Sequence, residues 1–144
     1  MKPKILGPAL FLLLTLSTRL LASSQDYAYE IIAENLDHPW GIAVLDNDDL
    51  LVTELTGKLR LIKNATLREM PLGGVPDVLF AGQGGLSGIA LDPSFSENKR
   101  IYLAFSSPDS NEKTNTLEVV SAIYNETEIT NVTTIFRASP SRKT

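Results

Sequence analysis

The residues in this sequence that are best suited to chemistry form a glycine-rich run, Gly82-Gln83-Gly84-Gly85-Leu86. Three glycines around one amide let the backbone adopt positive φ and approach a flat ligand closely. The Gln83 side chain offers both a hydrogen-bond donor and an acceptor. No lysine follows the run, so a phosphate-cradling loop is not indicated. A plain glycine turn is the competing interpretation.

His38 and the acidic run 46–49 are of residue types that could bind a metal or act in catalysis, but their sequence context argues against both roles. His38 is the single histidine, so a His pair or a histidine-based metal cluster is excluded. We expect His38 to be a turn residue beside Trp40, which packs against the fold. The acidic run 46–49 resembles the start of a calcium loop. Its sixth position is Leu51 and its twelfth is Gly57, where such a loop needs glycine and glutamate. The run therefore predicts a solvated hairpin turn, and we predict no catalytic residue and no metal ligand in this chain.

The first 24 residues have the order of a secretory signal peptide. Lys2 and Lys4 precede an apolar run over residues 5–16, and small residues follow, so cleavage after Ala22 or Ser24 is expected. The apolar run is shorter than the roughly 20 residues of a membrane-spanning helix. We therefore expect a signal peptide over 1–24 and an exported product over 25–144, secreted or, in a bacterium, periplasmic, with no membrane association after cleavage.

Charge and cysteine content narrow the partners and the chemistry. The leader carries three of the 13 basic residues and no acid, so 10 basic and 17 acidic residues remain, a net charge of −7. An acidic surface repels phosphate backbones, which argues against nucleic acid and anionic lipid as partners. The absence of cysteine excludes thiolate zinc sites and thiol nucleophiles, and it leaves stability to packing alone.

Three triplets match the acceptor pattern for N-glycosylation. They begin at Asn64, Asn125 and Asn131, each at an expected turn or strand edge. Chance matches are the alternative, because the sequence is rich in Asn, Ser and Thr. Glycosylation at these asparagines is thus a hypothesis for a eukaryotic host.

The chain from Tyr27 onward predicts an all-β fold. Apolar residues alternate or form short runs between turn residues, and no stretch keeps a 3.6-residue period long enough for a helix. Turns are expected at 46–49, 56–57, 64–65 and 93–99. The expected strands are Tyr27–Ala33, Gly41–Leu45, Leu50–Glu54, Lys58–Lys63, Ile89–Leu91, Arg100–Phe105, Leu117–Tyr124 and Ile129–Arg137.

One internal echo favours a propeller. The pattern of residues 41–46 and 50–53 returns at residues 88–92 and 101–104, and the offset from Gly41 to Gly88 is 47 residues. That offset is near the length of one four-stranded blade, about 40 to 50 residues. A β-sandwich with similar hairpins would give a comparable echo. Because a propeller needs at least four blades, the 120 residues after the leader would supply only two or three of them.

An ordered set of motifs carries a family resemblance. The chain is similar to the soluble quinoprotein glucose/sorbosone dehydrogenases in the order and spacing of these motifs over nearly everything after the leader. The motifs are Asp37-His38-Pro39-Trp40-Gly41-Ile42-Ala43, Leu51-Val52-Thr53-Glu54, Gly57-Lys58-Leu59-Arg60, Gly74-Val75-Pro76-Asp77-Val78, Gly82-Gln83-Gly84-Gly85-Leu86, Ile89-Ala90-Leu91-Asp92-Pro93-Ser94-Phe95, Ile101-Tyr102-Leu103 and Ile135-Phe136-Arg137-Ala138.

The resemblance implies a fold and an activity. It implies a six-bladed β-propeller that holds pyrroloquinoline quinone (PQQ) and calcium and oxidises aldose sugars at the anomeric carbon. Gln83 stands where the family has a glutamine that contacts the quinone. The family's histidine base lies in a His-x-Gly-Gly-Arg-like stretch shortly after the segment that matches 135–138, and no such stretch precedes Thr144. The resemblance therefore implies an N-terminal portion, the first two to three blades, that lacks the catalytic base and is inactive alone.

Departures from the family pattern leave two other functions open. Leu55, Ser87-Gly88 and the stretch 122–124 differ from residues that are common in the family, which puts the donor set of the channel wall in doubt. One alternative is a secreted propeller-like binding module without catalysis. The other is an oligomer in which several short chains close one propeller and so cover exposed strand edges.

Overall fold

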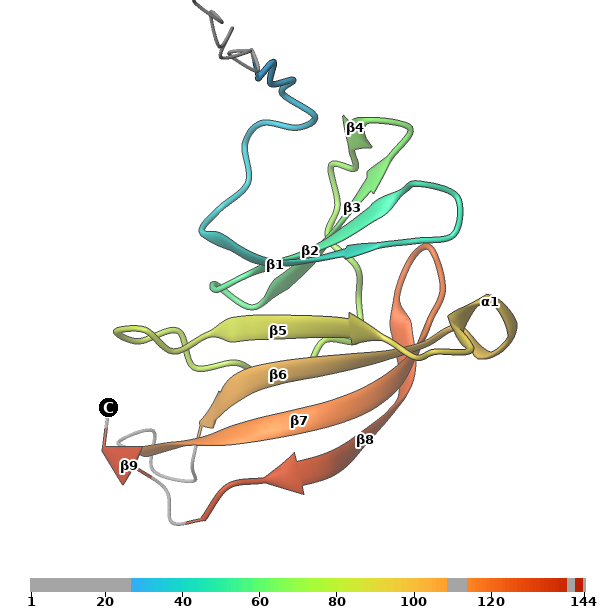
Figure 1. Cartoon of the computed structure of the whole chain (residues 1–144). Helices are drawn as coiled ribbons and strands as arrows, with labels where there is room; N and C mark the ends of the chain where they lie inside the picture. Colours follow the sequence, from blue (N-terminus) through green and yellow to red (C-terminus); the bar gives the residue numbers. More distant parts are fainter. Residues whose placement is uncertain (1–26, 109–113, 140–141, 144) are drawn as a thin grey trace, which may run out of the picture.

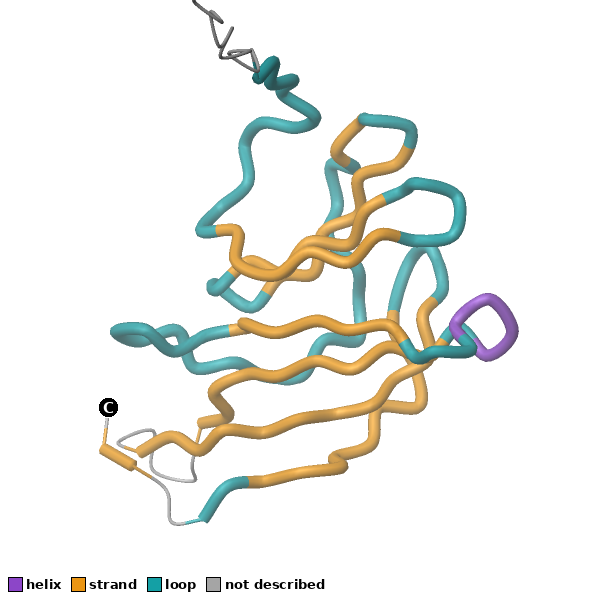
Figure 2. Tube along the Cα trace, in the orientation of Figure 1, coloured by secondary structure: helices purple, strands orange, loops and turns teal. Residues whose placement is uncertain are grey.

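The structure, a computed structural model, describes residues 27–108, 114–139 and 142–143. The expected signal peptide over 1–24 lies outside the described residues. Within the described ranges, no helix is long and apolar enough to cross a membrane. The described chain is almost entirely β-structure, arranged as two antiparallel sheets (Figures 1 and 2).

The first sheet is a meander of four strands in sequence order. Tight turns at 46–49, 55–57 and 64–65 separate its strands, and each pairs antiparallel with the next. The polar and glycine residues of these turns supply the backbone conformations that reverse the chain, including φ 63° at Asp48 and φ 99° at Gly57. The strands are β1 (Pro39–Val44), β2 (Leu50–Glu54), β3 (Lys58–Lys63) and β4 (Thr66–Leu67).

The second sheet repeats the meander with longer strands. One helical turn, α1 (Phe95–Asn98), connects its first two strands, and the last short strand pairs with β7. The turn predicted at 93–99 thus contains this single helical turn, which Lys99 ends in a left-handed conformation. The strands are β5 (Leu86–Leu91), β6 (Arg100–Pro108), β7 (Thr114–Tyr124), β8 (Ile129–Arg137) and β9 (Arg142–Lys143).

The two sheets pack against each other through alternate residues of their strands. Leu51, Leu59 and Leu61 of the first sheet are completely buried, and they share one apolar core with Ile101 and Leu103 of the second. The first strands of the two sheets, β1 and β5, lie side by side (Figure 1). Two such sheets, joined along their first strands, form two adjacent blades of a β-propeller, so the predicted all-β, incomplete propeller fold is confirmed.

The strand predictions succeeded where a turn and an apolar pattern agreed. Leu50–Glu54, Lys58–Lys63 and Ile129–Arg137 are confirmed at both ends, and the other strands after residue 38 are confirmed with shifted ends. The strand predicted at Tyr27–Ala33 is wrong. Residues 27–36 belong to no strand, and none of the described strands pairs with them.

The outer face of the first sheet remains partly exposed. Trp40, Ile42 and Val44 alternate along β1 with residues that face the core, and their exposed fractions are 64%, 60% and 58%. An apolar stripe of this kind is expected to be covered in a complete protein. It fits a blade that has a neighbour on only one side.

Candidate functional site

Three chain segments meet where β1 and β5 begin, the left end in Figure 1. We call this the glycine-loop end and define it as residues 37–41, 53–58 and 79–87. The segments are joined through their backbones: the Leu55 N–H donates to the His38 carbonyl at 3.0 Å, and the Leu86 N–H donates to the Leu55 carbonyl at 3.2 Å. The loop before β5 is therefore held against the entry to β1 through the turn after β2.

A buried hydroxyl fastens the same three segments a second time. The Thr53 Oγ1 accepts a hydrogen bond from the Gly41 N–H at 2.8 Å and donates one to the Ser87 carbonyl at 2.7 Å. Thr53 is fully buried. Gly41 has no room for a side chain, since a Cβ there would lie 2.6 Å from the Ser87 carbonyl oxygen. The strands β1, β2 and β5 are thus in close contact directly beneath the loop.

The glycines of the 82–85 run have different roles. A Cβ on Gly85 would lie 2.3 Å from the Leu55 carbonyl oxygen, and one on Gly84 would lie 2.8 Å from the Ser106 Oγ. Gly82, at φ 59°, has open space beside it. The Gly84 N–H donates to the Ala81 carbonyl at 2.8 Å, which closes a turn. Close packing by the protein itself therefore explains Gly84 and Gly85, and a tight turn explains Gly82.

Gln83 lies at the tip of this loop. Its side chain is exposed, and it makes no hydrogen bond within the described residues. The loop beneath it is fixed by the Ser106 N–H, which donates to the Gly85 carbonyl at 3.0 Å. A free amide on a fixed loop can bind a ligand that carries both acceptors and donors. The proposed quinone contact of Gln83 stays a prediction that this geometry permits.

An aspartate–histidine pair lies at the same end, which the sequence did not reveal as a pair. The His38 Nδ1 lies 2.6 Å from the Asp37 Oδ1, and the Lys58 Nζ lies 3.8 Å from the Asp37 Oδ2. The hydrogen bond to His38 lowers the pKa of the Asp37 carboxyl below its ordinary value. The His38 ring packs beside Phe80 with 5.3 Å between centroids. The adjacency of Asp37 and His38 in the sequence was the one signal that could have indicated this pair. The prediction of a turn at His38 did not use it.

A buried ion pair lies beneath Asp37. The Glu54 Oε1 accepts from the Asp37 N–H at 2.8 Å and from the Arg60 guanidinium at 3.2 Å. Glu54 is fully buried, and its Oε2 has no partner among the described residues. Arg60 is also buried and donates to the carbonyls of Arg68 and Glu69. This pair anchors the glycine-loop end, and its carboxylate is fully buried.

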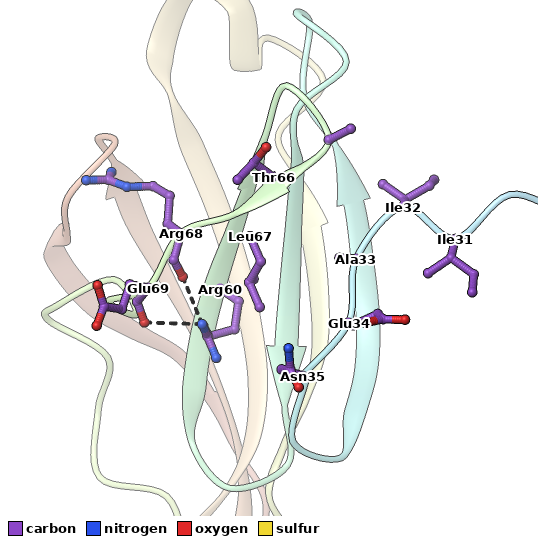
Figure 3. Close-up of a pocket in the computed structure, with 11 residues that line it drawn as sticks. Ile31, Ile32, Ala33, Glu34, Asn35, Arg60, Thr66, Leu67, Arg68 and Glu69 are labelled. Carbon is purple, nitrogen blue, oxygen red and sulfur yellow. Dashed lines mark hydrogen bonds between the residues drawn. The ribbon is translucent and has the colours of Figure 1, made fainter.

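The guanidinium of Arg60 borders a cavity of about 650 Å³ under the N-terminal segment (Figure 3). Residues 31–35, which belong to no strand, form one wall, and β3, β4 and the residues after β4 form the other. The dashed lines in Figure 3 show that one guanidinium nitrogen already serves two backbone carbonyls. One wall of this cavity belongs to no strand, and the Arg60 guanidinium already donates to backbone carbonyls. The cavity is therefore a weaker candidate site than the Gln83 amide, which has no partner among the described residues.

The remaining predicted positions lie away from the glycine-loop end. The described residues contain no group of three His, Cys, Asp or Glu side chains that could hold a metal. In the acidic turn, the Asp49 carboxylate accepts from the Asn64 N–H at 3.0 Å and from the Asn47 amide at 2.7 Å. The three glycosylation candidates, Asn64, Asn125 and Asn131, are exposed. Their modification stays a prediction.

Comparison with protein families identifies the chain. The family model described as glucose/sorbosone dehydrogenase matches residues 36–144, which contain all three segments of the glycine-loop end. This chain belongs to the glucose/sorbosone dehydrogenase family. The predicted resemblance is therefore confirmed.

Relatives within the glucose/sorbosone dehydrogenase family include an aldose sugar dehydrogenase of Escherichia coli. It is 35% identical over 134 residues, which cover 92% of this chain and 36% of the relative. The crystal structure of the soluble aldose sugar dehydrogenase from Escherichia coli in its apo form matches with a TM-score of 0.72 and 36% identity, over 78% of this chain and 33% of that one. This chain thus spans about a third of the length of these relatives.

Another solved relative contains the cofactor. The structure of the PQQ-bound form of the aldose sugar dehydrogenase from Streptomyces coelicolor matches with a TM-score of 0.66 and 32% identity, over 77% of this chain and 33% of that one. PQQ is thus a cofactor within the glucose/sorbosone dehydrogenase family.

Proposed function

We propose that this chain is the N-terminal part of an exported, PQQ-dependent dehydrogenase that oxidises aldoses at the anomeric carbon. Membership in the glucose/sorbosone dehydrogenase family and the PQQ-bound relative support this proposal. Among the chain's own residues, the unpartnered amide of Gln83 on a fixed loop carries it. The order of residues in 1–24 supports export.

The residues at the glycine-loop end fit the cofactor. PQQ is flat and rich in carboxylate and carbonyl oxygens, and the Gln83 amide can donate to such oxygens through two N–H groups. Gly82 and Gln83 are exposed, and among the described residues no atom beyond the chain neighbours of Gly82 lies within 4 Å of where its Cβ would stand, so the loop tip is accessible to a planar ligand. When bound, PQQ would supply a hydride acceptor, and a calcium ion would act as a Lewis acid beside it.

The chain's own contribution is to hold the glycine-rich loop in place and so to orient Gln83 towards the cofactor. Thr53, Leu55 and Gly85 fix the loop before any ligand arrives, so little conformational entropy is lost when Gln83 makes its contact. The described residues provide no three-ligand metal cluster. The calcium ligands are therefore proposed to come from later blades of the full-length protein.

The catalytic base is also proposed to come from outside these 144 residues. The family resemblance assigns it to a histidine after the segment that matches 135–138, and His38, which lies before β1, does not match that position. A base must come within hydrogen-bond reach of the proton it removes. We therefore expect no turnover from the 144 residues alone.

Reconstitution tests the proposed function. The full-length protein that carries these residues is supplied with PQQ, calcium and an aldose, and reduction of an artificial electron acceptor is followed. We expect turnover that requires PQQ, and none from the 144-residue product. Absence of turnover in the full-length protein, with quinone binding shown, would contradict the proposal and favour a binding module without catalysis.

A further inference from the structure

The Asp37–His38 pair and Phe80 are placed in a way that packing does not explain. The side chains of His38 and Asp37 are 59% and 46% exposed, and Phe80 is 43% exposed. His38 also has a φ of 53°, a left-handed conformation that is unfavourable for most side chains. An exposed aromatic ring beside an exposed imidazole contributes little to the core of the two described blades, so these blades gain little from the strained arrangement.

The backbone of this pair is nevertheless held firmly. The Asp37 N–H donates to the buried Glu54 carboxylate at 2.8 Å, and the His38 carbonyl accepts from Leu55 at 3.0 Å. The hydrogen bond between the His38 and Asp37 side chains fixes the imidazole orientation, and the Phe80 ring supports it from one side. The two side chains are thus preorganised although they face solvent.

The pair presents a defined hydrogen-bonding atom. A carboxylate can only accept, so in the neutral ring the His38 Nδ1 carries the proton and donates it to Asp37. The His38 Nε2 then carries a lone pair, and it has no partner within the described residues. It is available to accept a hydrogen bond from a hydroxyl group.

The pair lies beside the loop that carries Gln83. Phe80 belongs to this loop, three residues before Gln83, and contacts the His38 ring at 5.3 Å between centroids. The 47-residue echo makes Asp37 and His38 the counterparts of Gly84 and Gly85 in the next blade. Each blade therefore contributes the residues before its first strand to the same end of the molecule.

The charged side chains nearest to His38 balance each other. The Lys58 ammonium lies 3.8 Å from the Asp37 carboxylate, so the surroundings of His38 carry one charge of each sign. An apolar ring face beside a hydrogen-bond acceptor suits a saccharide, whose ring offers both C–H faces and hydroxyl donors.

We propose that His38 and Phe80 form a saccharide subsite at the glycine-loop end. A hydroxyl of the sugar donates to the His38 Nε2, the apolar face of a sugar ring packs on Phe80, and Asp37 is the positioning residue that fixes the imidazole tautomer. This rests on the proposed function, because the subsite would hold a sugar unit adjacent to the aldose that reacts.

Direct binding of maltose to the full-length protein, titrated by saturation-transfer difference NMR, tests the subsite without requiring turnover. His38→Asn keeps a residue that tolerates positive φ and removes the ring. Asp37→Asn can donate to Nδ1 and so turns Nε2 into a donor. We expect each variant to weaken maltose binding by a factor of about three to ten, as the loss of one hydrogen bond does. Phe80→Leu should weaken it severalfold.

The control is Asp48→Asn, a change of the same kind at an exposed, positive-φ position in the β1–β2 turn at the other end of the sheet. It should leave both maltose binding and the quinone dissociation constant unchanged. Unchanged maltose binding in folded His38→Asn and Asp37→Asn, or no maltose binding by the unaltered protein, would overturn the subsite. Failure of the proposed function shows itself separately, as no PQQ-dependent turnover of any aldose.

Discussion

The two ends of the blade pair differ in whether their polar side chains form hydrogen bonds within the protein. At the end that contains α1, which we call the helix end (residues 45–49, 92–99 and 125–128), turn side chains are consumed by internal hydrogen bonds. Asp92 accepts from the Ser94 N–H, the Asn98 amide and the Tyr102 hydroxyl, and the Asn125 Oδ1 accepts three hydrogen bonds from residues 127 and 128. The acceptor atoms of Asp92 and Asn125 are therefore already bonded within the turns.

At the glycine-loop end, in contrast, most hydrogen bonds join backbone groups, and two polar side chains keep atoms without a partner in the described residues. Thr53 and Leu55 fix the loop, while Gln83 and the His38 Nε2 have no partner in the described residues. The two ends thus differ in which polar atoms the described fold already uses: those of Asp92 and Asn125 at the helix end are bonded, and the Gln83 amide at the glycine-loop end is not. Substitutions can therefore separate the two ends.

The largest expected effect follows from the buried ion pair. Arg60→Leu should destabilise the protein by about 3–5 kcal/mol, because it leaves the fully buried Glu54 carboxylate without its cation. Lys63→Met, which breaks the exposed pair with Glu126 near the helix end, should cost less than about 1 kcal/mol. Urea unfolding at neutral pH measures both. Equal losses would show that the two pairs do not differ as their burial suggests.

The next effect distinguishes two glycines of one loop. Gly85→Ala should cost about 3 kcal/mol, since its Cβ would meet the Leu55 carbonyl oxygen and its φ is 148°. Gly82→Ala should cost about 1 kcal/mol, because its φ is 59° and nothing lies within 4 Å. Thermal unfolding of the two variants provides the comparison. A larger loss for Gly82→Ala would contradict the assigned packing.

Acid should weaken the helix end through Asp92. Its hydrogen bonds, first the one from the Tyr102 hydroxyl, lower the pKa of the Asp92 carboxyl from 3.8 to about 2. A lowered folded-state pKa stabilises the fold above the unfolded-state pKa, and this stabilisation is lost as the pH falls from about 4 towards about 2. Asp92→Asn should therefore flatten the pH dependence of the urea midpoint over this range. Asp48→Asn should leave that dependence unchanged.

The smallest expected effect is a gain at the β3–β4 turn. Asn64 and Ala65 both have positive φ, 49° and 56°, as a tight hairpin turn requires. Alanine is unfavourable there, so Ala65→Gly should stabilise the protein by about 1 kcal/mol. A small rise in the thermal midpoint would be the measured result, and a fall would show that Ala65 is not strained.

The sequence predicted the blades well because local and long-range signals agree in them. The turns at 46–49 and 56–57 bracket Leu50–Glu54, so its bounds were correct. The strand at Tyr27–Ala33 failed because its alternation has no described partner strand, and a partner is a long-range fact that a local pattern does not contain. Its apolar residues at 27, 29 and 31 are mostly exposed.

The candidate site was predictable only in part. The glycines around Gln83 indicated an unusual loop, but their individual reasons depend on Leu55 and Ser106, which are distant in the sequence. The pairing of Asp37 with His38 depended on a left-handed backbone at His38, and the approach of Phe80 depended on the fold. Residue types thus indicated where chemistry could lie, and tertiary contacts decided which atoms are free.

The most direct test of the contrast between the two ends is the quinone dissociation constant of Gln83→Ala in the full-length protein, measured together with its free energy of unfolding. We expect PQQ binding to weaken about tenfold, because an amide contact to a charged oxygen is lost. We expect the free energy of unfolding to stay unchanged, because the Gln83 side chain has no partner in the described fold. An unchanged dissociation constant would show that Gln83 does not contact the quinone.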